Sequence, residues 1–206
     1  MKHDHGHHHD AAFWDQMYRS RPRKTEPNVV LAETVAGRSP GTALDVCCGM
    51  GADAIWLAKQ GWKVTAIDMS NVALDRARDV DVAREVTWIH GDALVWQPPF
   101  EAYDLVSSQF LHVAPAERPA LFRKLGSSVR RGGTLLVVAH HASDLQTTVG
   151  RPPNPELYFT ADEIAASLAP EQWEIRFSGT RPRSGTDHQG RALTIQDMVF
   201  TARRRS

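Results

Sequence analysis

Glycine and acidic residues come together in the segment TALDVCCGMGADAI, residues 42–55. An apolar, β-rich run passes through Asp45, and Gly49 and Gly51 lie in the turn before a helical stretch. Glycine has no Cβ and adopts backbone angles that other residues avoid, so this turn can pass close to a ligand. Ligands of open α/β sheets bind at such strand ends. The segment therefore predicts a site for a nucleotide-like molecule.

The following β-rich runs also end in residues suited to binding. Asp68 closes KVTAID, where its carboxylate can accept hydrogen bonds from both hydroxyls of a ribose. Asp92 and Ala93 follow the third run, where they are expected near an adenine. The fourth run, YDLVSSQFLH, leads toward the same crevice. These residues are expected at one edge of the sheet, around one ligand.

Two other interpretations of the glycine turn stay open. A strand-to-helix turn can be purely structural. Residues 49–54, GMGADA, also satisfy the pattern G-x-G-x-x-A of nicotinamide-dinucleotide enzymes, with Asp68 downstream, so an NAD(P)-dependent oxidoreductase is the chief alternative. Asp45 within the turn, the Gly91–Asp92 pair and an expected antiparallel last strand weigh against that alternative.

The elements that position these residues follow from hydrophobic patterning. Five β-rich runs alternate with segments of helical spacing, which predicts βαβ units and a parallel sheet with helices on both faces. Two last runs have no helix between them and are expected to pair antiparallel. The prediction is an α/β, Rossmann-like, doubly wound sheet of seven strands, mostly parallel with an antiparallel C-terminal strand. The seven runs are 43–47, 63–67, 86–89, 104–107, 134–139, 173–177 and 194–201.

Composition narrows the class of protein. The 206 residues include 24 Lys and Arg against 24 Asp and Glu, which argues against a dedicated nucleic-acid binder. No window approaches the roughly 18 apolar residues of a membrane span, and no apolar signal core follows the N-terminus, so a cytoplasmic location is expected. The only cysteines, Cys47 and Cys48, are adjacent, which disfavours a disulfide or a Cys-rich zinc site.

The N-terminal segment differs from the rest of the chain. Residues 1–10, MKHDHGHHHD, contain five of the ten histidines and are expected to be a disordered tail. An expression tag, a solvated tail and a metal-binding tail are the alternatives, and the last would make a non-enzymatic metal-handling protein a third hypothesis. Residues 11–206 are expected to form one domain, whose segment 11–39 acts as a lid. No residue is assigned as a metal ligand.

The motifs in their order resemble class I S-adenosylmethionine-dependent methyltransferases over about residues 40–203. LDVCCGMG is similar to the first motif of that family and AIDMS to its ribose-binding motif. HGDAL, YDLVSSQFLH and RRGGTLLVVAHH resemble the motifs that follow. The resemblance implies S-adenosylmethionine as cofactor, methyl transfer as reaction and S-adenosylhomocysteine as product.

The resemblance also implies a role for individual residues. Asp45 would orient the turn and the methionine amino group, Asp68 would hold the ribose, and Met69 would pack on the adenine. Cys47 departs from the family pattern, which commonly has glycine there. The full cofactor-binding set is Asp45, Cys47, Gly49, Gly51, Asp68, Met69, Asp92, Ala93, Ser108 and Gln109.

Candidates for catalysis and acceptor binding are less specific. His112, His140 and His141 follow the fourth and fifth runs and could remove a proton from an acceptor, with a structural role as the alternative. FWDQMYRSRP and the compact length resemble small-molecule methyltransferases of the tellurite-resistance or thiopurine type. That resemblance implies a thiol, a chalcogen oxyanion or an aromatic heteroatom as acceptor, with no nucleic-acid or membrane partner; the oligomeric state is not assigned.

Overall fold

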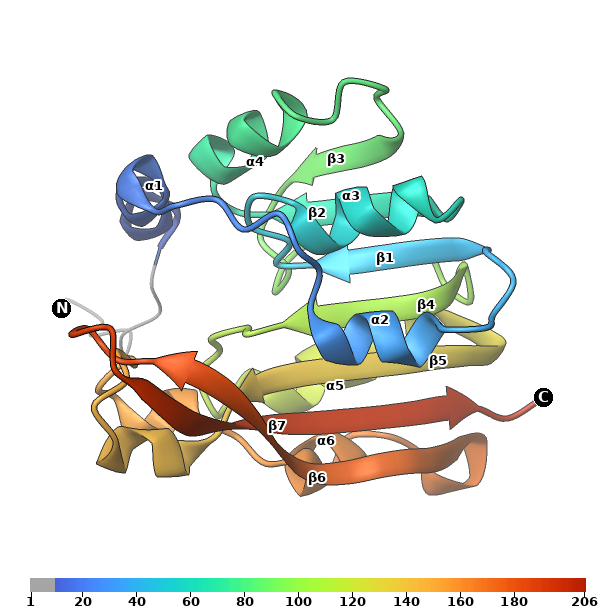
Figure 1. Cartoon of the computed structure of the whole chain (residues 1–206). Helices are drawn as coiled ribbons and strands as arrows, with labels where there is room; N and C mark the ends of the chain where they lie inside the picture. The colour runs from blue at the N-terminus through green and yellow to red at the C-terminus, as the bar shows by residue number, and fades with distance from the viewer. Residues whose placement is uncertain (1–9) are drawn as a thin grey trace, which may run out of the picture.

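The computed structural model describes residues 10–206, which form a seven-stranded sheet (Figure 1). The strand order is β3-β2-β1-β4-β5-β7-β6. Strands β1 to β5 are parallel, and β7 runs antiparallel between β5 and β6. The predicted fold class is therefore confirmed. The strands are β1 Thr42–Val46, β2 Lys63–Asp68, β3 Val86–His90, β4 Tyr103–Gln109, β5 Val129–His140, β6 Trp173–Thr186 and β7 Ala192–Arg204.

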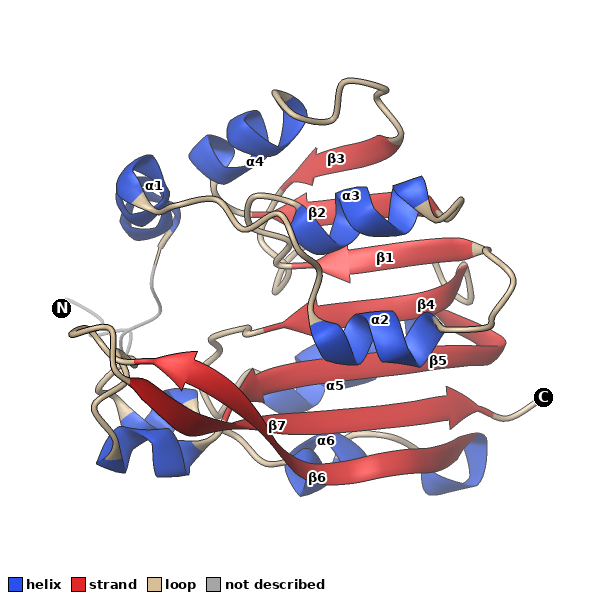
Figure 2. Ribbon diagram, in the orientation of Figure 1, coloured by secondary structure: helices blue, strands red, loops and turns tan. Residues whose placement is uncertain are grey.

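Helices cover both faces of this sheet (Figure 2). On one face α2 and α3 bury Leu31 and Leu57, and on the other α5 and α6 bury Phe122 and Ile164. The central strands are buried on both faces, which matches their continuous apolar runs. The helices are α1 Ala11–Ser20, α2 Val29–Val35, α3 Ala52–Lys59, α4 Asn71–Arg78, α5 Arg118–Ser128 and α6 Ala161–Ala166, with short 3-10 helices η1 Ala142–Gln146, η2 Pro155–Leu157 and η3 Pro170–Gln172.

The order of the strands locates the ligand crevice. From β1 the chain first builds outward through β2 and β3 and then returns to β4 on the other side of β1. At such a reversal the two connecting segments diverge, so a crevice opens outside the carboxyl ends of β1 and β4. Those ends point to the left in Figure 1, toward α1 and the tip of the β6–β7 hairpin. No helix among residues 10–206 has the length and apolarity to cross a bilayer.

The C-terminal hairpin is longer than the sequence predicts. The expected strands end at Phe177 and begin again at Thr194, but pairing continues to Thr186 and Ala192. Gly and Pro are depleted in strands, so the linking segment, which contains Gly179, Pro182 and Gly185, has no local strand signal. Its strand conformation comes from pairing with β7, and Pro182 is tolerated because β6 is the edge strand. The predicted bounds of these two strands are therefore too short, and the extension carries part of β6 to the edge of the sheet where β1 and β4 end.

Candidate cofactor and acceptor site

The turn after β1 has an unusual backbone. Cys47, Gly49 and Gly51 have positive φ values of 59°, 54° and 74°. Gly49 N donates to Asp68 Oδ2 at 2.8 Å, which joins the turn to the end of β2. Cys47 thus occupies a conformation that favours glycine, at the position where the family pattern commonly has one. Burial and the nearby Asp68 raise the pKa of its thiol well above the usual value, which disfavours a reactive thiolate.

Gly51 begins α3 in close contact with the rest of the fold. A Cβ at this residue would overlap the ring of Trp88, whereas a Cβ at Gly37 would meet nothing within 4 Å. Both glycines have φ near +74°, at 74° and 73°. We expect Gly51→Ala to destabilise the protein by about 3 kcal/mol, from backbone strain plus overpacking. Gly37→Ala, which adds strain alone, is expected to cost about 1 kcal/mol. Urea unfolding measures both, and equal losses would contradict the proposed overlap.

Three carboxylates lie beside this turn. Asp45 at β1 is 2% exposed, and its Oδ2 has no hydrogen-bond partner among the described residues. Burial raises the pKa of Asp45 well above the usual value, and Asp53 and Asp68 raise it further. Burial also raises the pKa values of Asp53 and Asp68. A buried carboxylate oxygen without a donor fits a cationic ligand group, such as the ammonium of a bound methionine moiety.

Asp68 is held in a position suited to a ribose. Its Oδ1 accepts from Ser70 N at 2.9 Å and its Oδ2 from Gly49 N at 2.8 Å. Each carboxylate oxygen can accept a second hydrogen bond, so capacity remains for two ribose hydroxyls. The neighbouring Met69 is half-buried, and its carbonyl oxygen lies 3.0 Å from His90 Nε2. Asp68 thus both orders the glycine turn and presents acceptors beside it.

The expected adenine side contains a residue that sequence reasoning missed. Lys124 of α5 donates to Ala93 O at 2.6 Å and to Leu94 O at 2.8 Å. Asp92 Oδ1 accepts from Leu94 N at 2.8 Å, so the loop after β3 is fastened from two sides. No local pattern signals this use of Lys124, because it acts on backbone carbonyls about thirty residues away in sequence. The loop that carries Asp92 and Ala93 is therefore supported by α5.

Helix α1 lies against the start of α4. Ser70 Oγ donates to Asp15 Oδ1 at 2.6 Å, and Arg76 Nη1 donates to Tyr18 O and to Arg21 O. None of the α1 residues is fully buried, so these hydrogen bonds contribute much of its attachment. Tyr18 covers the glycine turn, because a Cβ on Gly49 would lie 2.7 Å from its hydroxyl. Asp15 and Arg76 had no sequence signal, since their partners come from distant segments.

Two of the three histidines predicted for catalysis lie close together beside the end of β5. The ring centroids of His112 and His140 are 5.9 Å apart, and Trp14 lies 5.5 Å from His112. Phe110 stacks on His140 at 4.5 Å. His141 is placed differently, since its Nδ1 accepts from Ser143 N and caps η1. Two histidines therefore share the site, whereas His141 makes a local structural contact.

The residues that end β4 add unsatisfied polar atoms to the crevice. Ser108 is fully buried, and its Oγ has no partner among the described residues. Gln109 Nε2 donates to Ser107 Oγ at 2.8 Å, whereas Gln109 Oε1 has no partner there. Both side chains lie at the carboxyl end of β4, next to β1. Consecutive strand residues face opposite sides of the sheet, so these atoms leave unsatisfied polar groups on both sides of the end of β4.

The protonation of His140 has a consequence for stability. Burial, reinforced by Arg151, His112 and Arg183, lowers the pKa of His140 to about 2. The unfolded chain protonates this histidine near pH 6.5, so protons favour unfolding below that pH. The associated stability is present above about pH 6.5 and is lost as the pH falls. We expect the free energy of unfolding of the wild-type protein to fall by about 2 kcal/mol between pH 8 and pH 5. This decrease is expected to be absent in His140→Gln.

Urea unfolding of wild type and His140→Gln at both pH values checks this expectation. His141→Gln, at the next residue, is the matched control. Its free energy of unfolding is expected to fall between the two pH values by as much as that of the wild-type protein. An equal loss in wild type and His140→Gln would show that other groups carry the pH dependence.

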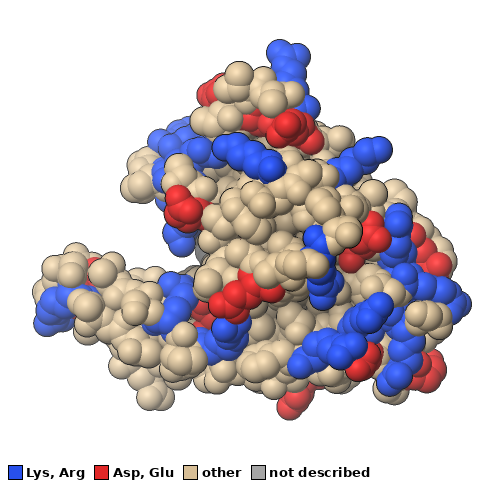
Figure 3. Space-filling model, turned by 45° about the vertical axis from the view of Figure 1, so that its right-hand side comes forward, with Lys and Arg blue, Asp and Glu red and all other residues tan. Residues whose placement is uncertain are grey.

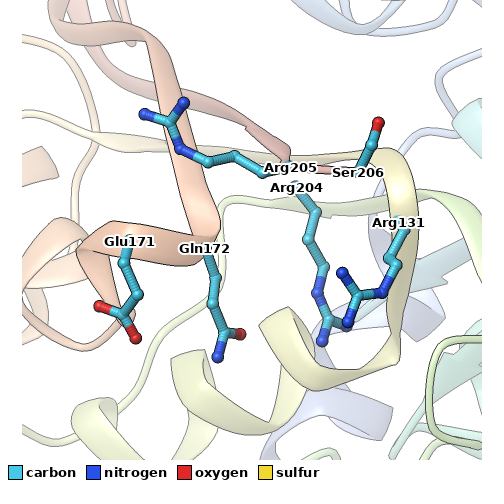
Figure 4. Close-up of a pocket in the computed structure, with 6 residues that line it drawn as sticks. All are labelled: Arg131, Glu171, Gln172, Arg204, Arg205 and Ser206. Carbon is cyan, nitrogen blue, oxygen red and sulfur yellow. The ribbon is translucent and has the colours of Figure 1, made fainter.

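The surface of the molecule is hollowed at this edge. Figure 3 shows a notch on the left, between the part that carries α1 and the part that carries the tip of the β6–β7 hairpin, with Lys and Arg side chains on both borders. A separate pocket lies at the opposite edge, where β5 begins and β7 ends (Figure 4). There Arg131 and Arg204 point to the same side, beside Gln172. This second pocket is remote from the glycine turn.

Comparisons with known proteins agree with the motif order. A family model for a methyltransferase domain matches residues 43–133. The glycine N-methyltransferase of Rattus norvegicus is 31% identical over 175 residues, covering 74% of this chain and 58% of the relative. An uncharacterized methyltransferase of Mycobacterium bovis is 40% identical over 96 residues, covering 46% of this chain and 48% of the relative. The chain thus spans less than two thirds of the length of these relatives.

Solved structures agree with the fold. A protein studied in the conversion of a disulfide bond into a thioacetal group during echinomycin biosynthesis has a TM-score of 0.76 and 25% identity, covering 95% of this chain and 92% of that one. TehB from Haemophilus influenzae has a TM-score of 0.70 and 19% identity, covering 95% and 67%. The methyltransferase-domain match over residues 43–133, the motif order and the antiparallel β7 all agree with the predicted resemblance to the class I S-adenosylmethionine-dependent methyltransferases.

Proposed function

We propose that this protein transfers a methyl group from S-adenosylmethionine to a small-molecule acceptor. The observation that carries the proposal is the buried Asp45 oxygen without a partner, beside a glycine turn held by Asp68. The acidic surroundings of this turn favour a cofactor with two cationic centres, its ammonium and its sulfonium. The same acidic surroundings disfavour a nicotinamide dinucleotide, because its phosphates are anionic and would be repelled.

The residues divide the work of such a reaction. S-Adenosylmethionine, when bound, supplies an electrophilic methyl group. Asp45 would hold the methionine ammonium, Asp68 would hold the ribose, and the loop of Asp92 and Ala93 would border the adenine. Tyr18 would cover the turn and exclude water. Methyl transfer depends mainly on positioning and on an enclosed site, so no catalytic triad is required.

Isothermal titration tests the cofactor. We expect saturable binding of S-adenosylmethionine and S-adenosylhomocysteine and none of NAD or NADP. Selective binding of a nicotinamide cofactor would overturn the proposal. A variant that lacks residues 1–10 belongs in the same experiment, because the His-rich tail, for which metal binding is one of three alternatives, lies almost wholly outside the described residues. Among residues 10–206 no cluster of three or more metal-ligating side chains occurs.

The acceptor classes predicted from sequence are a thiol, a chalcogen oxyanion and an aromatic heteroatom. His112 and His140 stand where a base for a protonated acceptor would be needed, although the low pKa of His140 makes it a weak base in the unliganded site. A screen of the three classes, with S-adenosylhomocysteine release as readout, identifies the acceptor. The tellurite-resistance or thiopurine type, the cytoplasmic location and the absence of nucleic-acid and membrane partners stay predictions.

We infer that α1 acts as a lid over the cofactor, because α1 rests on α4 mainly through hydrogen bonds. Arg76→Ala removes the donor to Tyr18 O and Arg21 O. We expect about a fivefold rise in the dissociation constant for S-adenosylmethionine and faster proteolysis within residues 19–24, since a loosened lid opens more often. Arg78→Ala on the same helix, which removes only an exposed pair with Asp75, is the control. Unchanged affinity and proteolysis in Arg76→Ala would contradict the lid.

A further inference from the structure

The acceptor side of the crevice is built from an aromatic and cationic stack. The guanidinium carbon of Arg183 lies 5.7 Å from the centroid of the Phe110 ring, and Phe110 stacks on His140 at 4.5 Å. Asp197 of β7 is the register partner of His140, and its Oδ2 accepts from Arg183 Nε at 2.5 Å. This single contact through Nε leaves the terminal amino groups of Arg183 available to a ligand.

Further basic groups converge on the same place. Arg151 and Arg21, together with Arg183, act on His140 strongly enough to contribute to its lowered pKa after the larger effect of burial. Partial burial, followed by Arg183 and Arg21, lowers the pKa of Lys24. Because these effects fall off with distance, the four basic side chains and His140 share one local electrostatic field.

The positive charge of this field is only partly compensated. Arg151 pairs with Asp144 at 2.8 Å, and Arg183 pairs with Asp197. Arg21 and Lys24 form no salt bridge with a carboxylate among residues 10–206, although Asp53 and Asp197 partly offset the effect of the arginines on Lys24. Burying cations beside one another without counter-charges costs free energy, so the arrangement is suited to an anion that arrives with the ligand.

Acidic side chains gather at the glycine turn and basic side chains at the Phe110–His140 stack, and Lys24 lies between the two groups because it interacts with both Asp53 and Arg183. Asp45, Asp53 and Asp68 surround the turn at the carboxyl end of β1. Arg183 lies near the end of β6 and Arg151 in the loop that follows η1, whereas Arg21 and Lys24 belong to the segment between α1 and α2. A cationic cofactor on one side and an anionic acceptor on the other would each meet complementary charge, which also disfavours the reversed placement.

We propose that the acceptor is a small molecule that carries a carboxylate or a similar oxyanion, bound by Arg183 and Lys24 beside the Phe110–His140 stack. The fork of a guanidinium matches the two oxygens of such a group. The neutral ring of His140 adds a hydrogen-bonding nitrogen, since its Nδ1 has no partner among the described residues. This inference rests on the proposed methyltransferase function and narrows its substrate class.

The test uses benzoate and benzamide, which have the same shape and differ in charge. Each is titrated into the full chain with and without bound S-adenosylhomocysteine. We expect benzoate to bind saturably and benzamide at least tenfold more weakly. Arg183→Gln is expected to weaken benzoate binding at least tenfold and to leave the affinity for S-adenosylmethionine within twofold. Arg181, two residues away, pairs with Glu33 on the surface and provides the control. Arg181→Gln is expected to bind benzoate and S-adenosylmethionine with wild-type affinity.

The possible results distinguish failure of the anionic-acceptor proposal from failure of the proposed methyltransferase function. Equal binding of benzoate and benzamide, wild-type benzoate binding by Arg183→Gln, or no binding of either probe would overturn the anionic acceptor. If the wild-type protein does not bind S-adenosylmethionine, the proposed function is overturned instead. The benzoate titration without cofactor would still decide whether the anion site exists.

Discussion

Asp68→Ala is expected to raise the dissociation constant for S-adenosylmethionine by about 100-fold. The substitution removes the acceptor for Gly49 N and for Ser70 N, which loosens the glycine turn. It also removes the acceptors expected for the ribose hydroxyls. Two charge-assisted hydrogen bonds contribute about 3 kcal/mol, which corresponds to this change in affinity. Isothermal titration of the folded variant measures the effect.

Asp104→Ala is the matched control for this experiment. Asp104 also accepts from a backbone N–H, that of Thr42 at 2.7 Å, but it lies where β4 begins, at the opposite edge of the sheet. The control is expected to lose stability and to keep its cofactor affinity. Wild-type affinity in a folded Asp68→Ala variant would remove Asp68 from the cofactor site.

Asp45→Asn is expected to change stability and affinity in opposite directions. Burial and two neighbouring carboxylates disfavour the charged form of Asp45 and raise its pKa. A group with a raised carboxyl pKa lowers stability as the pH rises from the unfolded pKa near 4 through the folded pKa. The uncharged asparagine avoids this cost, so the unliganded variant is expected to melt several degrees higher at pH 7.

The same substitution is expected to weaken S-adenosylmethionine binding by about 30-fold, since it removes the buried charge that faces the cofactor ammonium. Wild-type binding is also expected to release protons at pH values below the raised pKa of Asp45, because a bound cation lowers that pKa. Titration in two buffers with different ionisation enthalpies measures this release, and Asp45→Asn should show less of it. A destabilised variant with unchanged affinity would assign Asp45 a purely structural role.

Local sequence was sufficient to predict the fold and the placing of the glycine turn, Asp45 and Asp68 at one edge of the sheet. The βαβ pattern predicts the parallel sheet because strand and helix periods differ along the chain. The glycine turn, Asp45 and Asp68 follow from their places at the ends of strands, and parallel strands bring those ends to one edge. Cys47 could be recognised as a departure from the family motif, and the structure adds that its φ is 59°.

Tertiary structure alone decided which other residues reach that edge. His140 and His141 are adjacent in sequence, yet one joins the aromatic stack and the other caps η1. Arg183 has no local signal, because its placement depends on β6 pairing with β7 through a segment of low β propensity. Such contacts join residues tens of positions apart and depend on packing, which local propensity and periodicity do not contain.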